Sequence, residues 1–360
     1  MSKLSLAIIG TRGLPAEYSG FETLAENLVK YHFDNHLDIK LTVFCSRKNY
    51  KNNNTRYLNA DLFYLPISAN GISSIFYDGL SMMIASKMKC DTLLILGYSG
   101  AIFLPLVKLI SKSKIVINVD GIEWQRSKWS RIARYYLKLS EVIAVKNADI
   151  IIADNRGIDE YIFKSYNKKC EIIAYGGDQA ILVEQKIPTN ITLLSNYSLA
   201  IARIEPENNI ELIMNAFKDR SENNIVFIGN FSSTSYGKEI KEKYSKYKNI
   251  LMIEAIYDLA ILKSIRLNAK IYIHGHSAGG TNPSLVEIMH FGIPILAYDC
   301  IYNRYTTQDK AIYFKSSDDI INIIEKFNED LLKISANEMK KIANKNYRWR
   351  DIGSKYFSII

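Results

Sequence analysis

Residues 271–297 read IYIHGHSAGGTNPSLVEIMHFGIPILA, and this stretch contains one complete strand–loop–helix–strand unit. It opens with a short apolar run that predicts a buried strand, and apolar residues at helical spacing follow over Ser284–Phe291. Asn282 and Pro283 suit the N-cap and the first position of that helix. The apolar run Pro294–Ala297 then predicts the next strand. Two strands joined through a helix run parallel, so the stretch predicts a layered α/β fold.

The same alternation of strands and helices continues along the whole chain. In the first half, strands are predicted at Leu4–Ile9, Leu41–Phe44, Leu62–Leu65, Thr92–Leu96, Ile115–Val119, Ile150–Ala153 and Cys170–Ala174. In the second half, they are predicted at Ser198–Ala202, Ile225–Ile228, Ile250–Ile253, Ile271–Ile273, Pro294–Ala297 and Ala311–Phe314. The pattern weakens over residues 180–196, which we interpret as a linker. We therefore expect two Rossmann-like domains with doubly wound parallel sheets, at residues 1–180 and 190–340.

The composition is that of a folded globular protein, with 360 residues of which 48% are apolar and 23% charged. The cysteines are far apart in the chain and have neither metal-ligand nor redox spacing, which favours a reduced, cytoplasmic protein. The apolar run at the N-terminus is too short for a signal peptide. Glycines, Pro105 and Lys108 interrupt the apolar stretch 92–110, so we expect a strand, a loop and a helix there instead of a transmembrane helix.

The net charge is +9, and basic residues are concentrated over residues 108–138. They are Lys108, Lys112, Lys114, Arg126, Lys128, Arg131, Arg134 and Lys138, against Asp120 and Glu123. Such an excess favours an anionic partner, either phosphate, nucleic acid or a membrane surface, although a solvated helix face has the same pattern. In the predicted helix 127–146, Ile132 and other apolar residues have core spacing. We expect its basic face, 126–138, to rest on anionic headgroups without insertion, because exposed aromatic residues are few.

The loop at 276–284 is the strongest candidate for a binding site. Its glycines allow a tight turn with backbone N–H groups available at the start of a helix, where the helix dipole also favours an anion. The loop therefore predicts a diphosphate site. Glu287 lies about one turn into the helix, where its carboxylate can accept hydrogen bonds from ribose hydroxyls. An ordinary capped helix would have the same residues, and this alternative stays open. The residues of the predicted site are Gly279, Gly280, Thr281, Asn282, Ser284 and Glu287.

A second glycine-containing loop, GTRGLP at 10–15, follows the first predicted strand and leads into a helix after Gly20. Its spacing is not Gly-x-Gly-x-x-Gly, which disfavours a dinucleotide fingerprint. Backbone N–H groups near Gly13 and Gly20 can still approach a ligand closely at the helix start. An ordinary strand-to-helix turn is the alternative.

The segment NVDGIEW at 118–124 places a carboxylate at the end of a predicted strand. Asp120 at that position can orient or deprotonate an acceptor hydroxyl, and Glu123 and Arg126 stand close by in the sequence. The alternative is structural, with Asp120 capping a turn and Glu123 pairing with Arg126.

Arg203 ends the first strand of the second half, where a guanidinium can bind a diphosphate through two hydrogen bonds. The alternative is a surface ion pair with Glu205 or Glu207.

Metal chemistry is not indicated by the sequence. His274, His276 and His290 have no cysteine or acidic partner at the spacing of a zinc site. The chain also has no Asp-x-Asp, Ser-His-Asp or P-loop signature. We therefore expect neither a metal nor a cofactor.

Several of these motifs resemble those of a known family. The runs GGTNPSLVE (279–287), ARIEPENN (202–209) and YRWRDIGSKYF (347–357) resemble the second domain of glycosyltransferase family 4. These are retaining enzymes of the GT-B fold, which has two facing Rossmann-like domains. The runs at 8–29 and 118–129 resemble a bacterial subgroup that includes capsule rhamnosyltransferases, which transfer L-rhamnose from dTDP-rhamnose to a lipid-linked glucose. The resemblance extends over nearly the whole chain.

In the C-terminal half, the resemblance assigns roles to single residues. Glu287 matches the second glutamate of the family's E-x7-E motif, which binds the ribose, whereas Gly279 stands in place of the first glutamate. Arg203 matches the phosphate-binding arginine, and Asn208 replaces the lysine that usually follows it.

In the N-terminal half, Asp120 stands where many relatives have a histidine near the reacting sugar. Gly13 and Gly20 belong to a loop that closes near the donor phosphates. The terminal run implies that residues 341–360 form a C-terminal helix that returns to the first domain.

We therefore expect a cytoplasmic enzyme, peripheral on the inner face of the plasma membrane, that transfers a hexosyl group to a lipid-linked glycan in capsular or surface polysaccharide synthesis. The expected donor is dTDP-rhamnose, and the expected catalytic residues are Asp120, Arg203 and Glu287. Glu123 and Arg126 would complete the acceptor site. Retention of configuration is implied by the resemblance alone.

Two other classes of function are compatible with the sequence. A nucleotide-sugar epimerase would use the same donor site but no acceptor. A non-catalytic protein that binds sugar nucleotides or nucleic acid is the second alternative, although no nucleic-acid module is recognisable and we expect no nucleic-acid partner.

Overall fold

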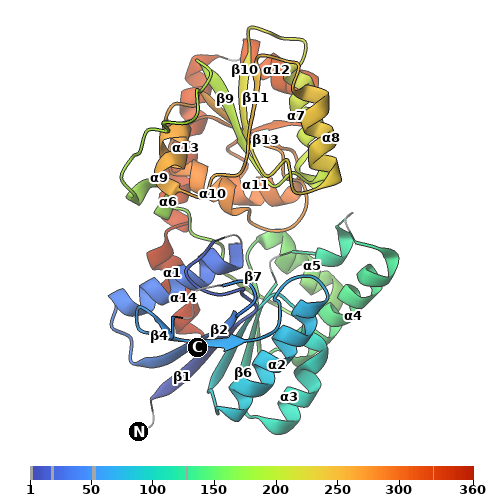
Figure 1. Cartoon of the computed structure of the whole chain (residues 1–360), viewed down its shortest axis with the longest axis vertical. Coiled ribbons are helices and arrows are strands. Elements are labelled where there is room, and N and C mark those ends of the chain that lie inside the picture. The colour runs from blue at the N-terminus through green and yellow to red at the C-terminus, as the bar shows by residue number, and fades with distance from the viewer. Residues whose placement is uncertain (1–2, 18–19, 51–53, 120, 127–128, 327) are drawn as a thin grey trace. The chain divides into compact units, whose positions relative to one another are not determined.

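The structure is a computed structural model that describes residues 3–17, 20–50, 54–119, 121–126, 129–326 and 328–360. It consists of two compact units (Figure 1). The N-terminal unit comprises Met1–Ala174 together with Trp349–Ile360, and the C-terminal unit comprises Tyr175–Arg348. The chain therefore passes between the units at residues 174–175 and 348–349, whereas the sequence placed the boundaries at 180–190 and 340–341.

The N-terminal unit is built on a sheet with the strand order β3-β4-β2-β1-β5-β6-β7-β8. Its strands are β1 (Leu4–Ile9), β2 (Ile39–Ser46), β3 (Arg56–Tyr57), β4 (Ala60–Leu65), β5 (Thr92–Leu96), β6 (Lys114–Val119), β7 (Ile150–Ala153) and β8 (Glu171–Ile172). The β3–β4 pair is antiparallel, and the other neighbouring pairs are parallel. Helices cover both faces of such a sheet, which explains why β5 is buried along its whole length.

The helices of this unit lie on two faces because the strand order reverses at β1. From β1, the chain first adds β2 on one side of the sheet and later adds β5, β6 and β7 on the other side. Because both sets of crossover connections are right-handed, their helices lie on opposite faces of the sheet. Accordingly, α14 packs against α1, whereas α3 packs against both α2 and α4 (Figure 1). The helices are α1 (Gly20–Asp34), α2 (Ser73–Lys87), α3 (Leu104–Ile110), α4 (Arg131–Asn147), α5 (Arg156–Tyr166) and α14 (Trp349–Ser358), with short 3-10 turns η1 (Ala101–Phe103) and η2 (Glu123–Gln125).

The C-terminal unit has a fully parallel sheet with the order β11-β10-β9-β12-β13-β14. Its strands are β9 (Tyr197–Ile201), β10 (Asn224–Ile228), β11 (Ile250–Ile253), β12 (Ile271–His274), β13 (Ile295–Tyr298) and β14 (Ile312–Phe314). Its helices are α6 (Gln179–Leu182), α7 (Ile210–Phe217), α8 (Ser235–Tyr244), α9 (Leu259–Leu267), α10 (Pro283–Met289), α11 (Ile301–Thr307), α12 (Ser317–Lys326) and α13 (Glu329–Asn346), with the turn η3 (Pro206–Asn208). The predicted fold class, two doubly wound α/β units, is confirmed.

The apolar stretch 92–110 forms a strand, a glycine-containing loop and a helix, as predicted. Among the described residues, no helix is both long enough and apolar enough to cross a membrane.

The C-terminal helix α14 belongs to the N-terminal unit, as the resemblance implied. The rings of Phe357 and Tyr31 stack on each other, with their centroids 5.7 Å apart. The Asn118 amide, at the end of β6, donates a hydrogen bond to the hydroxyl of Tyr356. Gly353 lies so close to α1 that a Cβ atom there would be 2.4 Å from the Tyr31 ring. The absence of a side chain at Gly353 is therefore what allows α14 to pack tightly on α1.

We predict that Gly353→Ala lowers the free energy of unfolding by about 1–3 kcal/mol, because the added methyl group overlaps the base of the Tyr31 side chain. Urea denaturation measures this change. Ser354→Ala on the same helix is the matched control, since Ser354 is exposed and alanine favours helices. Equal stability of the two variants would contradict the packing described here.

Candidate functional site

Three neighbouring strands of the C-terminal unit bring two predicted site segments, and one residue that the sequence did not indicate, to one edge of its sheet. Arg203 follows β9, the loop 275–282 follows β12, and Asp299 follows β13. These strands are adjacent and parallel, so their carboxyl ends lie at the same edge, where α/β proteins bind ligands.

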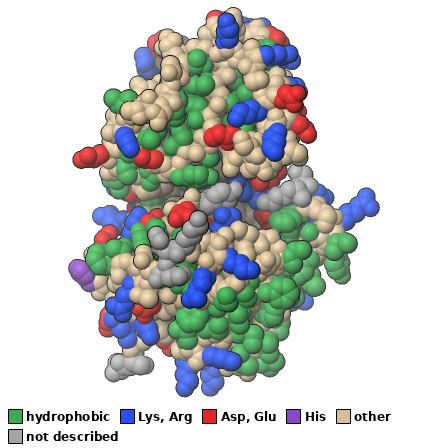
Figure 2. Space-filling view, in the orientation of Figure 1, with side chains coloured by type: hydrophobic (Ala, Val, Ile, Leu, Met, Phe, Trp, Pro, Cys, Tyr) green, Lys and Arg blue, Asp and Glu red, His purple; other side chains and the backbone are tan. Residues whose placement is uncertain are grey.

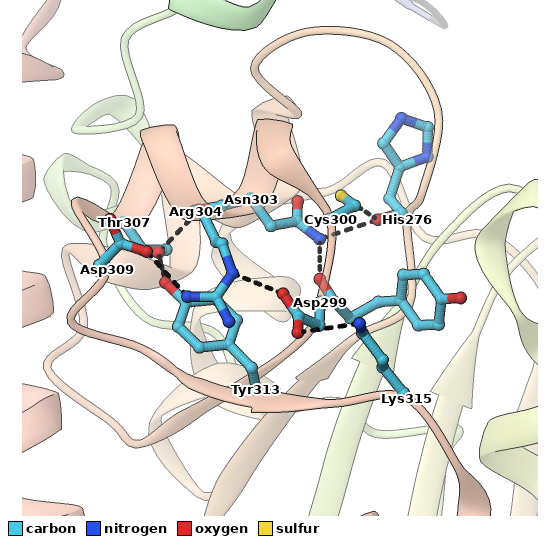
Figure 3. Close-up of polar contacts among 10 residues, drawn as sticks. His276, Asp299, Cys300, Asn303, Arg304, Thr307, Asp309, Tyr313 and Lys315 are labelled. Atoms are coloured by element: carbon cyan, nitrogen blue, oxygen red, sulfur yellow. Dashed lines mark hydrogen bonds and ion pairs between the residues drawn. The ribbon is translucent and has the colours of Figure 1, made fainter.

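The loop after β12 is fixed to the turn η3 and to helix α11. Ser277 donates from its backbone nitrogen and from its hydroxyl to the Glu207 carbonyl, at 2.9 and 2.8 Å. The His276 Nδ1 and Asn208 Oδ1 atoms are 2.6 Å apart. On the other side, the Asn303 amide donates to the His276 carbonyl at 2.8 Å (Figure 3). The predicted binding loop is therefore held on both sides by buried side chains.

The N-terminus of α10 has the predicted geometry. Asn282 is the N-cap, Pro283 is the first helical residue, and the Asn282 side chain accepts from the backbone nitrogen of Ser284 at 3.0 Å. The Ser284 hydroxyl donates to the same oxygen at 2.8 Å. Gly279 has a φ of +93°, which other residues rarely adopt, and it lets the chain turn before the helix.

Glu287 has two partners in the protein that the sequence did not indicate. Arg266, whose side chain is almost completely buried, donates from Nη2 to Glu287 Oε2. The Gln179 amide donates to Glu287 Oε1 at 2.8 Å. The Glu287 carboxylate thus compensates a buried positive charge, in addition to any role toward a ligand. Its oxygens have further lone pairs, so these bonds still allow it to accept from a hydroxyl.

Arg203 is about half exposed and lies 3.8 Å from the Glu205 carboxylate. This is the surface ion pair that the sequence left open as an alternative. Only the arginine side of this pair is exposed, since the Glu205 side chain is largely buried. At 3.8 Å the two charged groups are not in hydrogen-bond contact, so the guanidinium keeps its donors available for a diphosphate. Asn208, in place of the family's lysine, donates to the Arg203 carbonyl at 2.7 Å and so supports the backbone at this position.

The end of β13 carries an ionic cluster that sequence patterns did not single out (Figure 3). Arg304 Nε is 2.5 Å from Asp299 Oδ1, and Arg304 Nη1 is 2.9 Å from Asp309 Oδ1. The guanidinium also lies 4.3 Å from the centre of the Tyr313 ring. The hydrogen bond from Arg304 holds the pKa of the Asp299 carboxyl below its usual value. The cluster keeps the loop after β13 in place.

The buried histidine His274 stays uncharged, since burial lowers its pKa to about 3. Among the residues that the structure describes, no group of three or more His, Cys, Asp or Glu side chains could hold a metal ion.

In the N-terminal unit, the glycine-containing loop after β1 is held by two buried tyrosines. Tyr50 donates from its hydroxyl to the Pro15 carbonyl at 2.8 Å, and Tyr77 donates to the Thr11 carbonyl at 2.9 Å. A Cβ atom at Gly13 would be 3.0 Å from the Tyr50 ring. Gly20 is the first residue of α1. Gly13 thus lies in the loop at the carboxyl end of β1, and Gly20 opens the helix that follows this loop.

The predicted acceptor residues lie after β6, which is the second neighbour of β1 in the sheet. Asp120 lies outside the described residues. The Glu123 carboxylate is 3.0 Å from Arg126 Nη1 and accepts from Trp129 Nε1 at 2.9 Å. The pairing that the sequence left open as a structural alternative is therefore present. It orients both side chains in the loop.

Lys138 corrects the prediction of a continuous basic face at 126–138. Its ammonium group is 2.9 Å from the buried carboxylate of Glu141 and also bonds the hydroxyls of Tyr161 and Tyr166. It lies 4.9 Å from the centre of the Trp124 ring. Lys138 therefore serves to fix α5 and the loop after β6 to α4. Lys128, which belongs to the same predicted face, lies outside the described residues.

Asp78 is a buried carboxyl group of α2 at the carboxyl end of β5, and sequence patterns did not reveal it. It accepts a hydrogen bond from Ser99, which follows β5. Burial raises the pKa of Asp78 to about 7, and the hydrogen bond from Ser99 opposes this rise. Its ionised form is therefore disfavoured in the folded protein.

We predict that stability falls as the pH rises from about 4 to about 7, because the folded protein retains a proton on Asp78 that the unfolded chain releases. Asp78→Asn removes this contribution, and the variant should be more stable than the parent at pH 8 by about 2–4 kcal/mol. Urea denaturation at pH 5 and pH 8 measures the difference. If the free energy of unfolding changed with pH in the same way in both proteins, the ionisation of Asp78 would not destabilise the fold, and the prediction would be wrong.

Comparison with known proteins gives two family matches. Residues 3–178 match the family described as "Domain of unknown function (DUF1972)", and residues 184–349 match "Glycosyl transferases group 1". No curated protein sequence matches the chain.

Solved structures match over nearly the whole chain. Sucrose-phosphate synthase from Thermosynechococcus elongatus has a TM-score of 0.81 at 12% identity, covering 99% of this chain and 98% of its own. HepE of Anabaena, in complex with UDP and glucose, has a TM-score of 0.74 at 12% identity, with 99% of each chain covered. The trehalose-6-phosphate synthase OtsA has a TM-score of 0.74 at 10% identity, with 99% and 98% covered.

At these identities the structural matches define the fold, which is that of the GT-B glycosyltransferases. Together with the group 1 match on the C-terminal unit, they support a GT-B glycosyltransferase.

Proposed function

We propose that this protein is a metal-independent, retaining hexosyltransferase that uses dTDP-L-rhamnose as donor and a lipid-linked glycan as acceptor. The observation that carries the proposal is that the loop 275–282 and the start of α10 lie at the same carboxyl edge of the C-terminal sheet as Arg203. This chain segment matches group 1 glycosyltransferases. A neighbour of the same fold binds UDP and glucose, which supports a nucleotide sugar as donor.

The donor diphosphate would be bound by Arg203 and by the backbone N–H groups of the loop 279–284. Their positive electrostatic potential would stabilise the charge that develops on the leaving diphosphate. Gly13 and Gly20 would contribute backbone groups to the same phosphates. The guanidinium of Arg203 is about half exposed, and its 3.8 Å distance from Glu205 is too long for a hydrogen bond, so its donors can turn toward a diphosphate.

Glu287 would accept a hydrogen bond from the ribose. Substitution of Glu287 is an unsuitable test, because it would leave Arg266 buried without its counter-ion and would destabilise the fold. The nucleotide can be changed instead. The sugar of dTDP is 2′-deoxyribose, and loss of its 3′-hydroxyl, as in 2′,3′-dideoxy-TDP, should weaken binding to the parent protein about 3- to 30-fold. Calorimetric titration measures both affinities. Equal affinities would contradict the proposed hydrogen bond between Glu287 and the sugar of the nucleotide.

The acceptor would bind to the N-terminal unit. Asp120 would orient or deprotonate the acceptor hydroxyl, while the Glu123–Arg126 pair would shape the site around it. The lipid-linked acceptor and the basic residues of the N-terminal unit suggest that the enzyme works at the inner face of the plasma membrane, in the synthesis of a capsular or surface polysaccharide.

The activity is tested by measuring nucleoside diphosphate release from dTDP-, UDP- and GDP-sugars, with lipid-linked glucose as acceptor and EDTA present. We expect acceptor-dependent dTDP release from dTDP-rhamnose. Turnover of another donor would support the transferase activity but contradict the assignment of rhamnose as the donor sugar. Sugar interconversion without an acceptor would indicate an epimerase instead, and the absence of any donor binding would contradict the proposal.

We predict that Arg203→Ala weakens donor binding about 10- to 100-fold, because a charge-assisted contact with the diphosphate is lost. Arg220→Ala is the matched control. Arg220 is similarly exposed and has one carboxylate partner, Glu325, but it lies before β10 at the amino edge of the same sheet. A similar loss in both variants would mean that general electrostatics, and not a site at Arg203, binds the donor.

A further inference from the structure

The outer surface of helices α2, α3 and α4 carries large apolar side chains that the proposed chemistry does not use. The most exposed are Leu109 (83%), Ile132 (85%), Ile72 (80%) and Tyr135 (76%). The full set, which we call the apolar ridge, is Ile72, Phe76, Leu80, Ile102, Leu106, Leu109, Ile110, Ile132, Tyr135 and Leu139. Hydrophobic side chains gather over these helices in Figure 2. Contiguous exposed apolar surface of this kind marks an interaction site.

The ridge is continuous because its members recur every three or four residues on helices that touch. Phe76 and Leu80 are separated by one turn of α2, and Ile132, Tyr135 and Leu139 follow the same side of α4. Helix α3 packs against both neighbours, so the three apolar stripes lie side by side. The sequence placed Ile132 in the core. That prediction was wrong, because α4 buries another side, which includes Leu137, Ser140 and Ala144.

The exposed charged residues on the ridge helices themselves are basic, whereas the nearest exposed carboxylates, Asp91 and Asp149, lie in the segments that follow α2 and α4. On α2, α3 and α4, which the structure describes in full, the acidic residues are Asp78 and Glu141, and both are buried. Arg131 is exposed at the start of α4, and Lys108 on α3 is paired with Asp149 at 3.0 Å. Other exposed basic residues stand at the C-terminal ends of these helices or just after them, among them Lys87 on α2, Lys112 after α3 and Lys146 on α4. These ends lie at the amino edge of the sheet, because each helix runs antiparallel to the strand that follows it.

We propose that the apolar ridge inserts into the surface of an anionic lipid bilayer, with Lys87, Lys112 and Lys146 bound to the lipid phosphates. A bilayer offers acyl chains for the apolar stripes and negative charge for the lysines next to them. A second copy of the chain fits less well, since a two-fold interface would bring the same lysines toward each other without exposed carboxylates on these helices.

This contact differs from the headgroup contact of the basic face 126–138. Lys138 on that face is bound to Glu141, whereas the ridge presents apolar side chains to the outside. Membrane insertion extends the proposed function and rests on it, because a lipid-linked acceptor would have to be reached at a bilayer. Membrane binding is measured without donor or acceptor, and donor binding is measured without lipid. The two experiments can therefore contradict the membrane proposal and the proposed function separately.

The test is cosedimentation of the full chain with vesicles of equal parts phosphatidylcholine and phosphatidylglycerol. We expect the parent protein to bind, and the double variant Leu109→Asp, Ile132→Asp to bind at least about tenfold more weakly. The matched control is Leu182→Asp, Ile187→Asp, which changes the same residue types at similarly exposed positions of the C-terminal unit. This control should bind vesicles like the parent. Equal dTDP binding by all three proteins would show that they are folded.

Insertion has a separate signature. Tyr135→Trp should give fluorescence that is quenched by vesicles with brominated acyl chains, beyond the quenching of the parent protein. Unchanged vesicle binding by the ridge variant, or absence of vesicle binding by the parent, would overturn the proposal. Conversion of a dimeric parent into a monomer by the ridge variant, without vesicle binding, would show that the ridge is a self-association surface instead.

Discussion

Both candidate sites depend on the close approach of backbone segments at the carboxyl edge of each sheet. Gly10 directly follows β1, and a Cβ atom there would lie 2.2 Å from the Leu96 carbonyl oxygen. Gly275 directly follows β12, and a Cβ atom there would lie 2.2 Å from the Asn208 carbonyl oxygen. Any other residue would push the first loop away from the end of β5, or the second loop away from the turn η3. The positions of the loop after β1 and of the loop before α10 are therefore set by two glycines that do not need to touch a ligand.

Charged side chains at these edges are mostly paired within their own unit. Glu287 is bound to Arg266, Glu123 to Arg126, and Asp299 to Arg304. Such pairs hold loops in a defined geometry before any ligand arrives, which lowers the entropy lost on binding. In our proposal, backbone N–H groups and Arg203, which is 3.8 Å from Glu205, bind the diphosphate.

The N-terminal unit combines two surfaces with different tasks. Its carboxyl edge carries the loops that we assign to the acceptor, and the outer side of α2, α3 and α4 carries the apolar ridge. The lipid-linked acceptor that we propose would reach its binding site from a bilayer. On the opposite face of the sheet, helix α14 packs against α1. The face formed by α2, α3 and α4 instead carries the exposed side chains of the apolar ridge.

The sequence by itself determined the features that depend on neighbouring residues. Strand positions follow from short apolar runs, and the cap formed by Asn282 and Pro283 follows from local backbone geometry. Only the tertiary structure decided which side chains meet across elements. Arg266 and Glu287 come from different helices, and nothing in their spacing indicates an ion pair. Ile132 has the periodicity of a core residue yet is exposed, because periodicity tells which residues share a helix face but not which face a neighbouring element covers.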